Sequence, residues 1–267
     1  MKTGYHSVYS KTYFAGIDDA KKYGFDFAQF DLGVPDYFLN DISAEKLSEI
    51  RKYAEYNGVE ITFHAPGDNI GLFCDYPGIR QGILDEFKLM LEKANTLEAR
   101  HMTFHTGTYS MFKKSGEKAD DSRSDYYENV LYENLKAIIK SCGNVLICVE
   151  NSELNNTARR TLQRIMNENA KLYLTLDMAK MYTSDRKIIT EDFNFFLKNK
   201  NNIRELHIHD KNDTFGSHQT VEEGFVDFTL FKQFFNENTY VNFEVRPVEA
   251  AKKSKDNLNK ILGDILN

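Results

Sequence analysis

The chain has 267 residues, of which 41% are hydrophobic and 28% are charged, with a net charge of −6 and a pI of about 5.7. This length lets one domain bury a large core without disulfides or structural metals. The acidic balance disfavours a nucleic-acid partner, and no apolar run approaches the roughly 20 residues that a membrane span requires.

Strand-like and helix-like segments alternate along the first half of the chain. Short runs rich in β-branched and aromatic residues predict strands at Thr3–Val8, Phe25–Leu32, Glu60–Phe63 and Arg100–Phe104. Caps and helical spacing predict helices near Gly16–Tyr23, from Ser43 to about Asn57, where Gly58 ends it, and over about Ile79–Leu97. The polar segment Lys113–Asp125 predicts a loop after the fourth strand.

The same alternation continues to the end of the chain. Further strands are predicted at Val145–Val149, Leu172–Leu176, Ile203–Ile208 and Tyr240–Val245. Helices are predicted from Ser122 or Ser124 onward, at Thr157–Asn169, Glu191–Lys198, Phe228–Asn236 and Ala250–Leu266. Eight strand–helix units in one domain, residues 1–267, favour a (β/α)8 TIM barrel of roughly 250 residues. An open doubly wound sheet is the alternative, because an alternating pattern does not demonstrate closure.

Most of the predicted strands end in a residue that can bind a metal or move a proton. These residues are His64, His105, Glu150, Asp177, His207 and Glu244. The second strand ends less clearly, on Asp31. Because the carboxyl ends of parallel barrel strands meet at one face, we expect these side chains to converge there.

The residue types in this set indicate a divalent-metal site. Glu150, Asp177, His207 and Glu244 supply three carboxylates and one imidazole, which suit Mn, Mg, Co or Zn. His64 and His105 shift the preference toward zinc, or toward a second ion bridged by a carboxylate. The sequence therefore predicts one or two divalent ions.

Three further residues near the strand ends have open interpretations. His209 shares a strand face with His207 and either orients a ligand or substrate oxygen, or is structural. Arg246 binds a substrate carboxylate or phosphate, or forms a structural salt bridge. Lys180 reaches the site or is a solvated loop residue.

The remaining polar residues and cysteines are interpreted as structural. His6 and His101 are expected to form structural hydrogen bonds, and Asp210 to cap a turn or orient a ligand. Cys74, Cys142 and Cys148 are odd in number and lack CxxC spacing, which indicates reduced thiols and a cytoplasmic protein.

Taken together, the strand-end motifs resemble the xylose isomerase-like barrel superfamily over nearly the whole chain. The motifs are HAP at His64, H-x-G at His105, E-N at Glu150, L-D at Asp177, H-x-H-D at His207, and the late Glu244. This superfamily contains sugar and sugar-phosphate isomerases and epimerases, and also endonuclease IV. The resemblance implies a (β/α)8 barrel with a divalent metal at its C-terminal mouth.

The epimerase branch implies that one metal is held by Glu150, Asp177, His207 and Glu244. Glu150 and Glu244 would then also act as acid and base on the substrate carbon. Lys180 stands where many epimerases have a histidine, and it could stabilise an enolate oxygen as a point charge. The residues expected to contact substrate are His64, His209, His218 and Arg246.

The endonuclease IV branch implies three zinc ions, and the chain departs from that pattern. Lys180 and Gly216 replace two of the three ligands of the third zinc, which leaves His218 free for substrate contact. Gly67 replaces the aromatic residue that commonly follows HAP. The G-x-G turn near residue 222 is also altered, because Glu222 replaces its first glycine.

Three hypotheses follow from the sequence. The first is a metal-dependent sugar or sugar-phosphate isomerase or epimerase with a small carbohydrate substrate. The second is a metal-dependent phosphodiesterase or abasic-site nuclease. The third is a non-catalytic sugar-binding barrel that carries no metal. A homo-oligomer is compatible with each of them.

Overall fold

Eight parallel strands close into a barrel in this computed structural model, which describes residues 1–67, 70–111, 115, 123–152, 154–168, 171–263 and 265–266. The barrel strands are β1 (Lys2–Ser7), β2 (Phe27–Asp31), β3 (Glu60–His64), β4 (His101–Phe104), β5 (Leu146–Glu150), β6 (Leu172–Asp177), β7 (Ile203–Ile208) and β10 (Tyr240–Phe243). Hydrogen bonds between β1 and β10 close the ring. The predicted TIM barrel is confirmed, with strand bounds that differ from the expected ones by a residue or two, and the open sheet is wrong.

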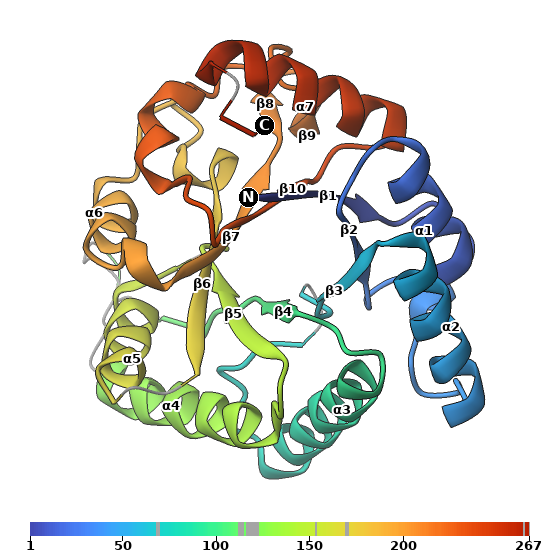
Figure 1. Cartoon of the computed structure of the whole chain (residues 1–267). Coiled ribbons are helices and arrows are strands. Elements are labelled where there is room, and N and C mark those ends of the chain that lie inside the picture. The colour runs from blue at the N-terminus through green and yellow to red at the C-terminus, as the bar shows by residue number, and fades with distance from the viewer. Residues whose placement is uncertain are drawn as a thin grey trace.

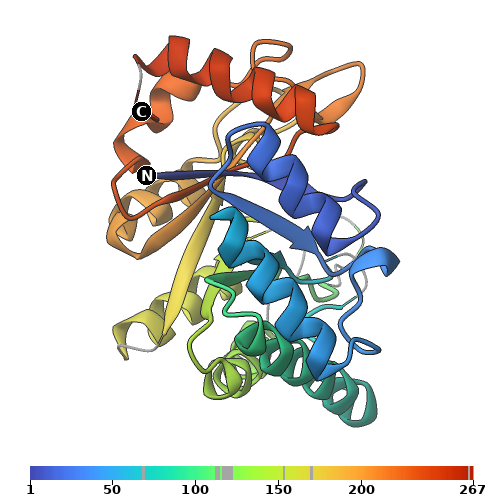
Figure 2. The ribbon, with the colours of Figure 1, turned by 45° about the vertical axis from the view of Figure 1, so that its right-hand side comes forward.

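Seven α-helices lie around the outside of the strands in the described part of the chain (Figures 1 and 2). They are α1 (Tyr13–Lys22), α2 (Ala44–Asn57), α3 (Pro77–Thr96), α4 (Ser124–Ser141), α5 (Asn156–Asn167), α6 (Thr190–Lys198) and α7 (Val248–Leu262). α1 starts earlier than predicted because the Thr12 hydroxyl accepts the N–H of Ala15 and caps it. α2 is capped by Ser43 and ended by Gly58 in the left-handed conformation, as expected.

The helical segment after β7 differs from the prediction in type and length. Phe228–Phe234 forms a 3₁₀ helix, η4, and does not extend to Asn236. Its buried aromatic residues, Phe228, Phe231 and Phe234, recur every third residue, which matches three residues per turn. Three shorter 3₁₀ segments are η1 (Pro35–Tyr37), η2 (Ala179–Met181) and η3 (Lys200–Asn202).

A two-stranded hairpin between β7 and η4 was not predicted. It consists of β8 (Asp210–Asn212) and β9 (Gly216–Gln219), which pair antiparallel. The last helix is shorter than predicted at its carboxyl end. α7 stops at Leu262 and not at Leu266, because Gly263 takes a left-handed conformation. Ser122, Asn169 and most of the predicted loop between residues 113 and 125 lie outside the described residues.

The amino ends of the strands are joined by an ion network around Glu60. Lys2 Nζ and Arg100 Nη2 each lie 2.6 Å from Glu60 Oε1, and the Tyr240 hydroxyl donates to Glu60 Oε2 at 2.8 Å. Lys2, Glu60 and Tyr240 lie in β1, β3 and β10, and Arg100 directly precedes β4, so the network links several strands of the ring.

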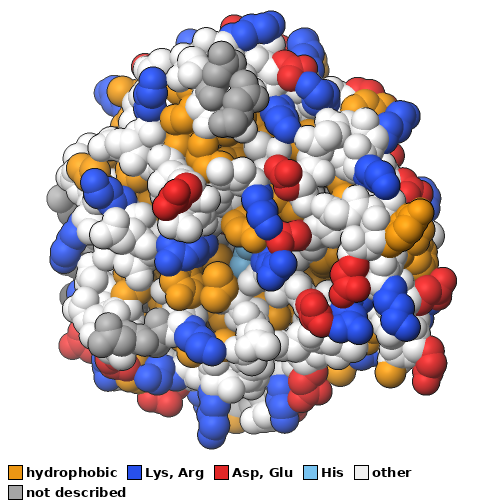
Figure 3. Space-filling model, in the orientation of Figure 1, with side chains coloured by type: hydrophobic (Ala, Val, Ile, Leu, Met, Phe, Trp, Pro, Cys, Tyr) orange, Lys and Arg blue, Asp and Glu red, His pale blue; other side chains and the backbone are white. Residues whose placement is uncertain are grey.

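The surface and the cysteines agree with the composition. Lys and Arg side chains are interspersed with Asp and Glu on the face drawn in Figure 3, without gathering into one basic patch there. Cys74, Cys142 and Cys148 are free thiols. Among the described residues, no helix combines the length and the apolar character needed to cross a membrane.

Candidate metal centre

The barrel brings all six strand-end residues to its carboxyl face. His64, Glu150 and Asp177 are the last residues of β3, β5 and β6. His207 is next to last in β7, while His105 and Glu244 directly follow β4 and β10. Each of these side chains is therefore positioned by the end of a hydrogen-bonded strand. A strand end holds a side chain more rigidly than a loop does.

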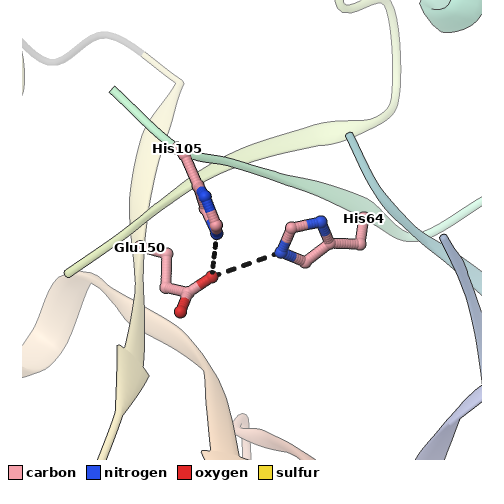
Figure 4. Close-up of side chains that lie close together, drawn as sticks. All are labelled: His64, His105 and Glu150. Atoms are coloured by element: carbon pink, nitrogen blue, oxygen red, sulfur yellow. Dashed lines mark hydrogen bonds and ion pairs between the residues drawn. The ribbon is translucent and has the colours of Figure 1, made fainter. Parts of the chain in front are cut away.

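One cluster consists of His64, His105 and Glu150 (Figure 4). The Nε2 atoms of His64 and His105 lie 3.2 and 2.8 Å from the same carboxylate oxygen, Glu150 Oε2. His64 Nδ1 lies 2.8 Å from the backbone carbonyl of Ala65, to which it donates. In a neutral His64, Nε2 is therefore an acceptor that faces the carboxylate oxygen Glu150 Oε2, which is also an acceptor. A proton or a cation must lie between these two atoms.

A second cluster shares Glu150 and adds Asp177 and His207. Their potential ligand atoms lie within 4.8 Å of one another. His207 Nδ1 is also 3.2 Å from Glu244 Oε1 and 3.6 Å from Glu150 Oε2. The four residues predicted to hold one ion are thus adjacent, and three of the four are carboxylates.

Lys180 points into this acidic cluster. Its ammonium group donates to Glu150 Oε1 and lies 3.5 Å from Asp177 Oδ2. The segment η2 follows β6 directly, and the backbone N–H of Lys180 donates to Asp177 Oδ1 at 3.0 Å. Lys180 therefore reaches the site and is not a solvated loop residue.

The buried carboxylates stay ionised because cationic neighbours outweigh their desolvation. Burial alone would raise the pKa of Glu150, but the Lys180 ammonium and nearby imidazoles hold that pKa well below its usual range. The pKa of Glu244 is lowered in the same way, against its burial, chiefly by His207. Conversely, burial would lower the pKa of His207, but the surrounding carboxylates raise it well above its ordinary value.

A divalent cation fits this set of donors. Ionised carboxylates and imidazole nitrogens are ligands that zinc and manganese accept. Among the described residues, neither ring nitrogen of the fully buried His207 makes a hydrogen bond, and it is Nδ1 that faces Glu150 and Glu244. A bound cation would satisfy this nitrogen together with Glu150 and Glu244.

His209 and His218 lie beside the cluster on its outer side. His209 Nε2 is 3.1 Å from Asp177 Oδ2, and His209 Nδ1 accepts the backbone N–H of His218 at 3.0 Å. His218 Nδ1 lies 2.9 Å from the Glu244 carbonyl oxygen. His209 thus orients Asp177. Together with Glu244 the two histidines form a third group whose potential ligand atoms lie within 4.8 Å of one another.

Asp210 fixes the loop that carries His218. Its buried carboxylate accepts backbone N–H groups from Lys211, Glu222, Gly224 and Val226 at 2.8–3.1 Å. A Cβ on Gly224 would lie 2.2 Å from Asp210 Oδ1, so only glycine fits there. The expectation that Asp210 caps a turn is confirmed.

Arg246 contacts His6, and it does not line the cavity of about 400 Å³ that lies over the site. Its Nη2 donates to His6 Nδ1 at 2.7 Å. With Nδ1 accepting, neutral His6 carries its proton on Nε2, which lies 3.3 Å from Asp31 Oδ2. His6 Nδ1 is also 3.6 Å from Glu244 Oε1, so the contacts that His6 makes lie at the border of the site.

A cavity of about 400 Å³ opens above these residues. Its lining residues are His6, Asp31, Gly33, Val34, His64, Pro66, Gly67, His105, Ser152, Lys180, His218 and Glu244. Glu150, Asp177 and His207 are fully buried and do not line it. The cavity is thus polar and large enough for a small polyhydroxylated molecule.

One buried carboxylate near the site was missed at the sequence level. Glu205 lies inside the barrel, with Oε2 3.1 Å from His207 Nε2. Its signal is a charged residue within the strand IRELHI, two positions before His207 and therefore on the same face.

The chain belongs to the xylose isomerase-like TIM barrel family, whose sequence profile matches residues 17–261. It is 26% identical over 214 residues to the uncharacterized protein MJ1614 of Methanocaldococcus jannaschii, covering 79% of this chain and 78% of that protein. The family membership agrees with the resemblance carried by the strand-end motifs.

Solved structures of low sequence identity share the fold. D-psicose 3-epimerase from Clostridium cellulolyticum H10, solved with D-tagatose, is 15% identical with a TM-score of 0.72, covering 98% of this chain and 99% of that one. The TTHB071 protein from Thermus thermophilus, soaked with ZnCl2, is 19% identical with a TM-score of 0.72, covering 99% of each chain. At these identities the similarity describes the barrel alone.

Proposed function

We propose that the chain is a divalent-metal-dependent isomerase or epimerase of a small sugar or sugar phosphate. The observation that carries this proposal is the meeting of Glu150, Asp177, His207 and Glu244 beneath a polar cavity of about 400 Å³. Membership in the family supports it, as does the fold shared with a D-psicose 3-epimerase.

The first cation would bind Glu150, Asp177, His207 and Glu244, and the His64–His105–Glu150 cluster offers a second place. A bound divalent cation would polarise a sugar carbonyl and stabilise the charge that develops when the neighbouring carbon loses its proton. Carboxylate and imidazole donors of this kind suit Mn, Zn, Co or Mg.

Of the two carboxylates, Glu244 would hold the transferred proton. Glu244 lines the cavity, and we assign its Oε2 to removing the proton from the substrate carbon. Glu150 is buried, and its Oε1 accepts from the Lys180 ammonium, which does line the cavity. Lys180 would therefore hold a substrate oxygen. Glu150 would keep that ammonium in place and would be the second carboxylate of the pair formed with Glu244.

The remaining polar lining would bind sugar hydroxyl groups. His64 and His218 line the cavity with ring nitrogens, whereas His209 contributes by holding Asp177. Arg246 acts through His6, to which it donates, and not by direct contact. His6 in turn holds the cavity-lining Asp31.

Deuterium exchange from D2O tests the proposal without knowing the product. Sugars such as D-psicose, D-tagatose and L-ribulose, with their phosphates, are incubated with the protein and Mn²⁺, Co²⁺ or Zn²⁺. We expect deuterium at one carbon next to a carbonyl of one sugar, seen by NMR. Glu244→Gln should lower that exchange by about 10²–10⁴-fold, the usual contribution of general acid–base catalysis.

Glu60→Gln is the matched control, because Glu60 lies at the opposite end of the barrel. It should exchange deuterium at the wild-type rate. Absence of exchange with every sugar and metal, or an unchanged rate in Glu244→Gln, would refute the proposal.

A phosphodiesterase is the second candidate, favoured by the intact His64–His105–Glu150 cluster. A single-metal epimerase does not need two extra imidazoles. Incubation with abasic duplex DNA and zinc tests this alternative. Incision that disappears in His105→Ala would replace the isomerase proposal, and absence of incision would eliminate the alternative.

A further inference from the structure

A buried carboxylate lies inside the barrel directly below the candidate metal centre. Glu205, on β7, has no exposed surface. Its contacts are Gln29 Nε2 at 2.7 Å, Thr103 Oγ1 at 2.5 Å, Thr175 Oγ1 at 3.2 Å, His101 Nε2 at 3.0 Å and His207 Nε2 at 3.1 Å. Barrel interiors are ordinarily filled by bulky branched apolar residues, so this charge is an exception with a substantial desolvation cost.

The two oxygens of Glu205 serve different neighbours. Oε1 faces Gln29 and His101. Oε2 faces Thr103, Thr175 and the imidazole of His207. The threonines and the glutamine donate to the carboxylate, so their hydrogen bonds hold it in one orientation.

The two ring nitrogens of His207 point in opposite directions. Nε2 lies 3.1 Å from Glu205 Oε2, and Nδ1 lies 3.2 Å from Glu244 Oε1 in the metal cluster. A carboxylate is an acceptor only, so it favours a proton on Nε2. The Nδ1 lone pair is then directed toward Glu150 and Glu244, where a cation would bind.

We propose that Glu205 is a positioning residue that fixes the ring orientation and the tautomer of His207 for metal binding through Nδ1. This inference rests on the proposed function, in which His207 is a metal ligand. Carboxylate partners of metal-bound histidines raise the basicity of the ligand, and their loss typically costs about 10–100-fold in metal affinity.

Cobalt titration of Glu205→Gln tests this role. The side-chain amide presents N–H groups as well as an oxygen, so it no longer requires a proton on His207 Nε2. We expect Co²⁺ to bind about 10–100-fold more weakly, with a changed visible absorption spectrum of the bound ion. Glu205→Asp, which keeps an acceptor-only group, should recover part of the affinity. Wild-type affinity and spectrum in Glu205→Gln would overturn the proposal.

His101→Asn is the matched control for loss of buried polar contacts. His101 contacts Glu205 Oε1, the oxygen that does not face His207. It should lower the melting temperature while the cobalt affinity stays within about threefold of wild type, well short of the loss expected for a metal-orienting carboxylate. An equal loss of affinity in His101→Asn would mean that Glu205 acts only by supporting the fold, which would also overturn the proposal.

Nitrogen-15 NMR of the zinc-loaded wild-type protein gives an answer even where Glu205→Gln does not fold. We expect His207 to show a metal-bound Nδ1 and a protonated Nε2. Zinc bound through Nε2 would overturn the inference while leaving a metal centre intact. A wild-type protein that binds neither cobalt nor zinc would overturn the proposed metal dependence and this inference together. Cobalt loss in Glu205→Gln without sugar exchange in wild type would overturn only the proposed reaction.

Discussion

Replacing Gly67 with alanine would test whether His105 must stay where the structure places it. A Cβ built on Gly67 lies 2.4 Å from His105 Nδ1 and 2.8 Å from its Cε1. Atoms in van der Waals contact pack at about 3.5–4.0 Å, so the imidazole would have to retreat by about 1 Å. Glycine at this position therefore makes room for the ring.

The consequence for metal binding follows from the distance to Glu150. His105 Nε2 lies 2.8 Å from Glu150 Oε2, and a shift of about 1 Å exceeds the roughly 0.5 Å tolerance of a functional site. We expect zinc affinity at the His64–His105–Glu150 cluster to fall by about 10–100-fold, as for other losses of ligand positioning. The free energy of unfolding should change little, because His105 is partly exposed and can move into the cavity.

Isothermal titration with zinc, together with a melting curve, measures both effects. Gly82→Ala, in helix α3, is the control, because nothing lies within 4 Å of the added Cβ. It should bind zinc as the wild type does and gain up to about 1 kcal/mol from the better helix former. Unchanged zinc affinity and stoichiometry in Gly67→Ala would show that His105 is not a ligand.

Three further substitutions address stability. Glu222→Gly should raise the free energy of unfolding by about 0.5–1 kcal/mol, because Glu222 has φ of 78°, a left-handed conformation that glycine adopts without strain. Gly4→Ala should lower it by about 1–3 kcal/mol, since its Cβ would meet the Phe27 ring at 2.4–2.5 Å. Burial would raise the pKa of Glu60, but Lys2 and its other partners lower it. Glu60→Gln should therefore cost about 1 kcal/mol at pH 7, and this difference should vanish as acid protonates Glu60, below its unfolded pKa of about 4.3.

Denaturant titration at several pH values checks these three expectations. A destabilised Glu222→Gly would mean that the side chain of Glu222 makes a contact worth more than its backbone strain. A neutral Gly4→Ala would mean that the Phe27 ring relaxes freely. A Glu60→Gln difference that grows as the pH falls would have the wrong sign for a carboxyl whose pKa is depressed on folding.

The strand-end residues could be predicted because a parallel barrel places them by rule. His64, Glu150 and Asp177 each end an apolar run, and the carboxyl ends of such strands meet at one face. No knowledge of the loops was needed.

Contacts that depend on ring closure could not be predicted in this way. His6 meets Glu244 only because β1 pairs with β10 from the far end of the chain. Arg246 lies beyond the end of β10 at Phe243, where strand alternation no longer fixes the side-chain direction. Glu205 was overlooked because a charged residue in a barrel strand is ordinarily expected at the strand end.

The hairpin that carries His218 is attached to the barrel, but its strands are not barrel strands. Asp210, its first residue, accepts backbone N–H groups of Glu222, Gly224 and Val226 beyond the hairpin, and neither hairpin strand is part of the closed eight-stranded ring. Sequence changes there can exchange side chains that border the cavity without altering the barrel strands. Under the proposed function, such changes would alter which sugar is accepted while Glu244, which follows a barrel strand, stays in place.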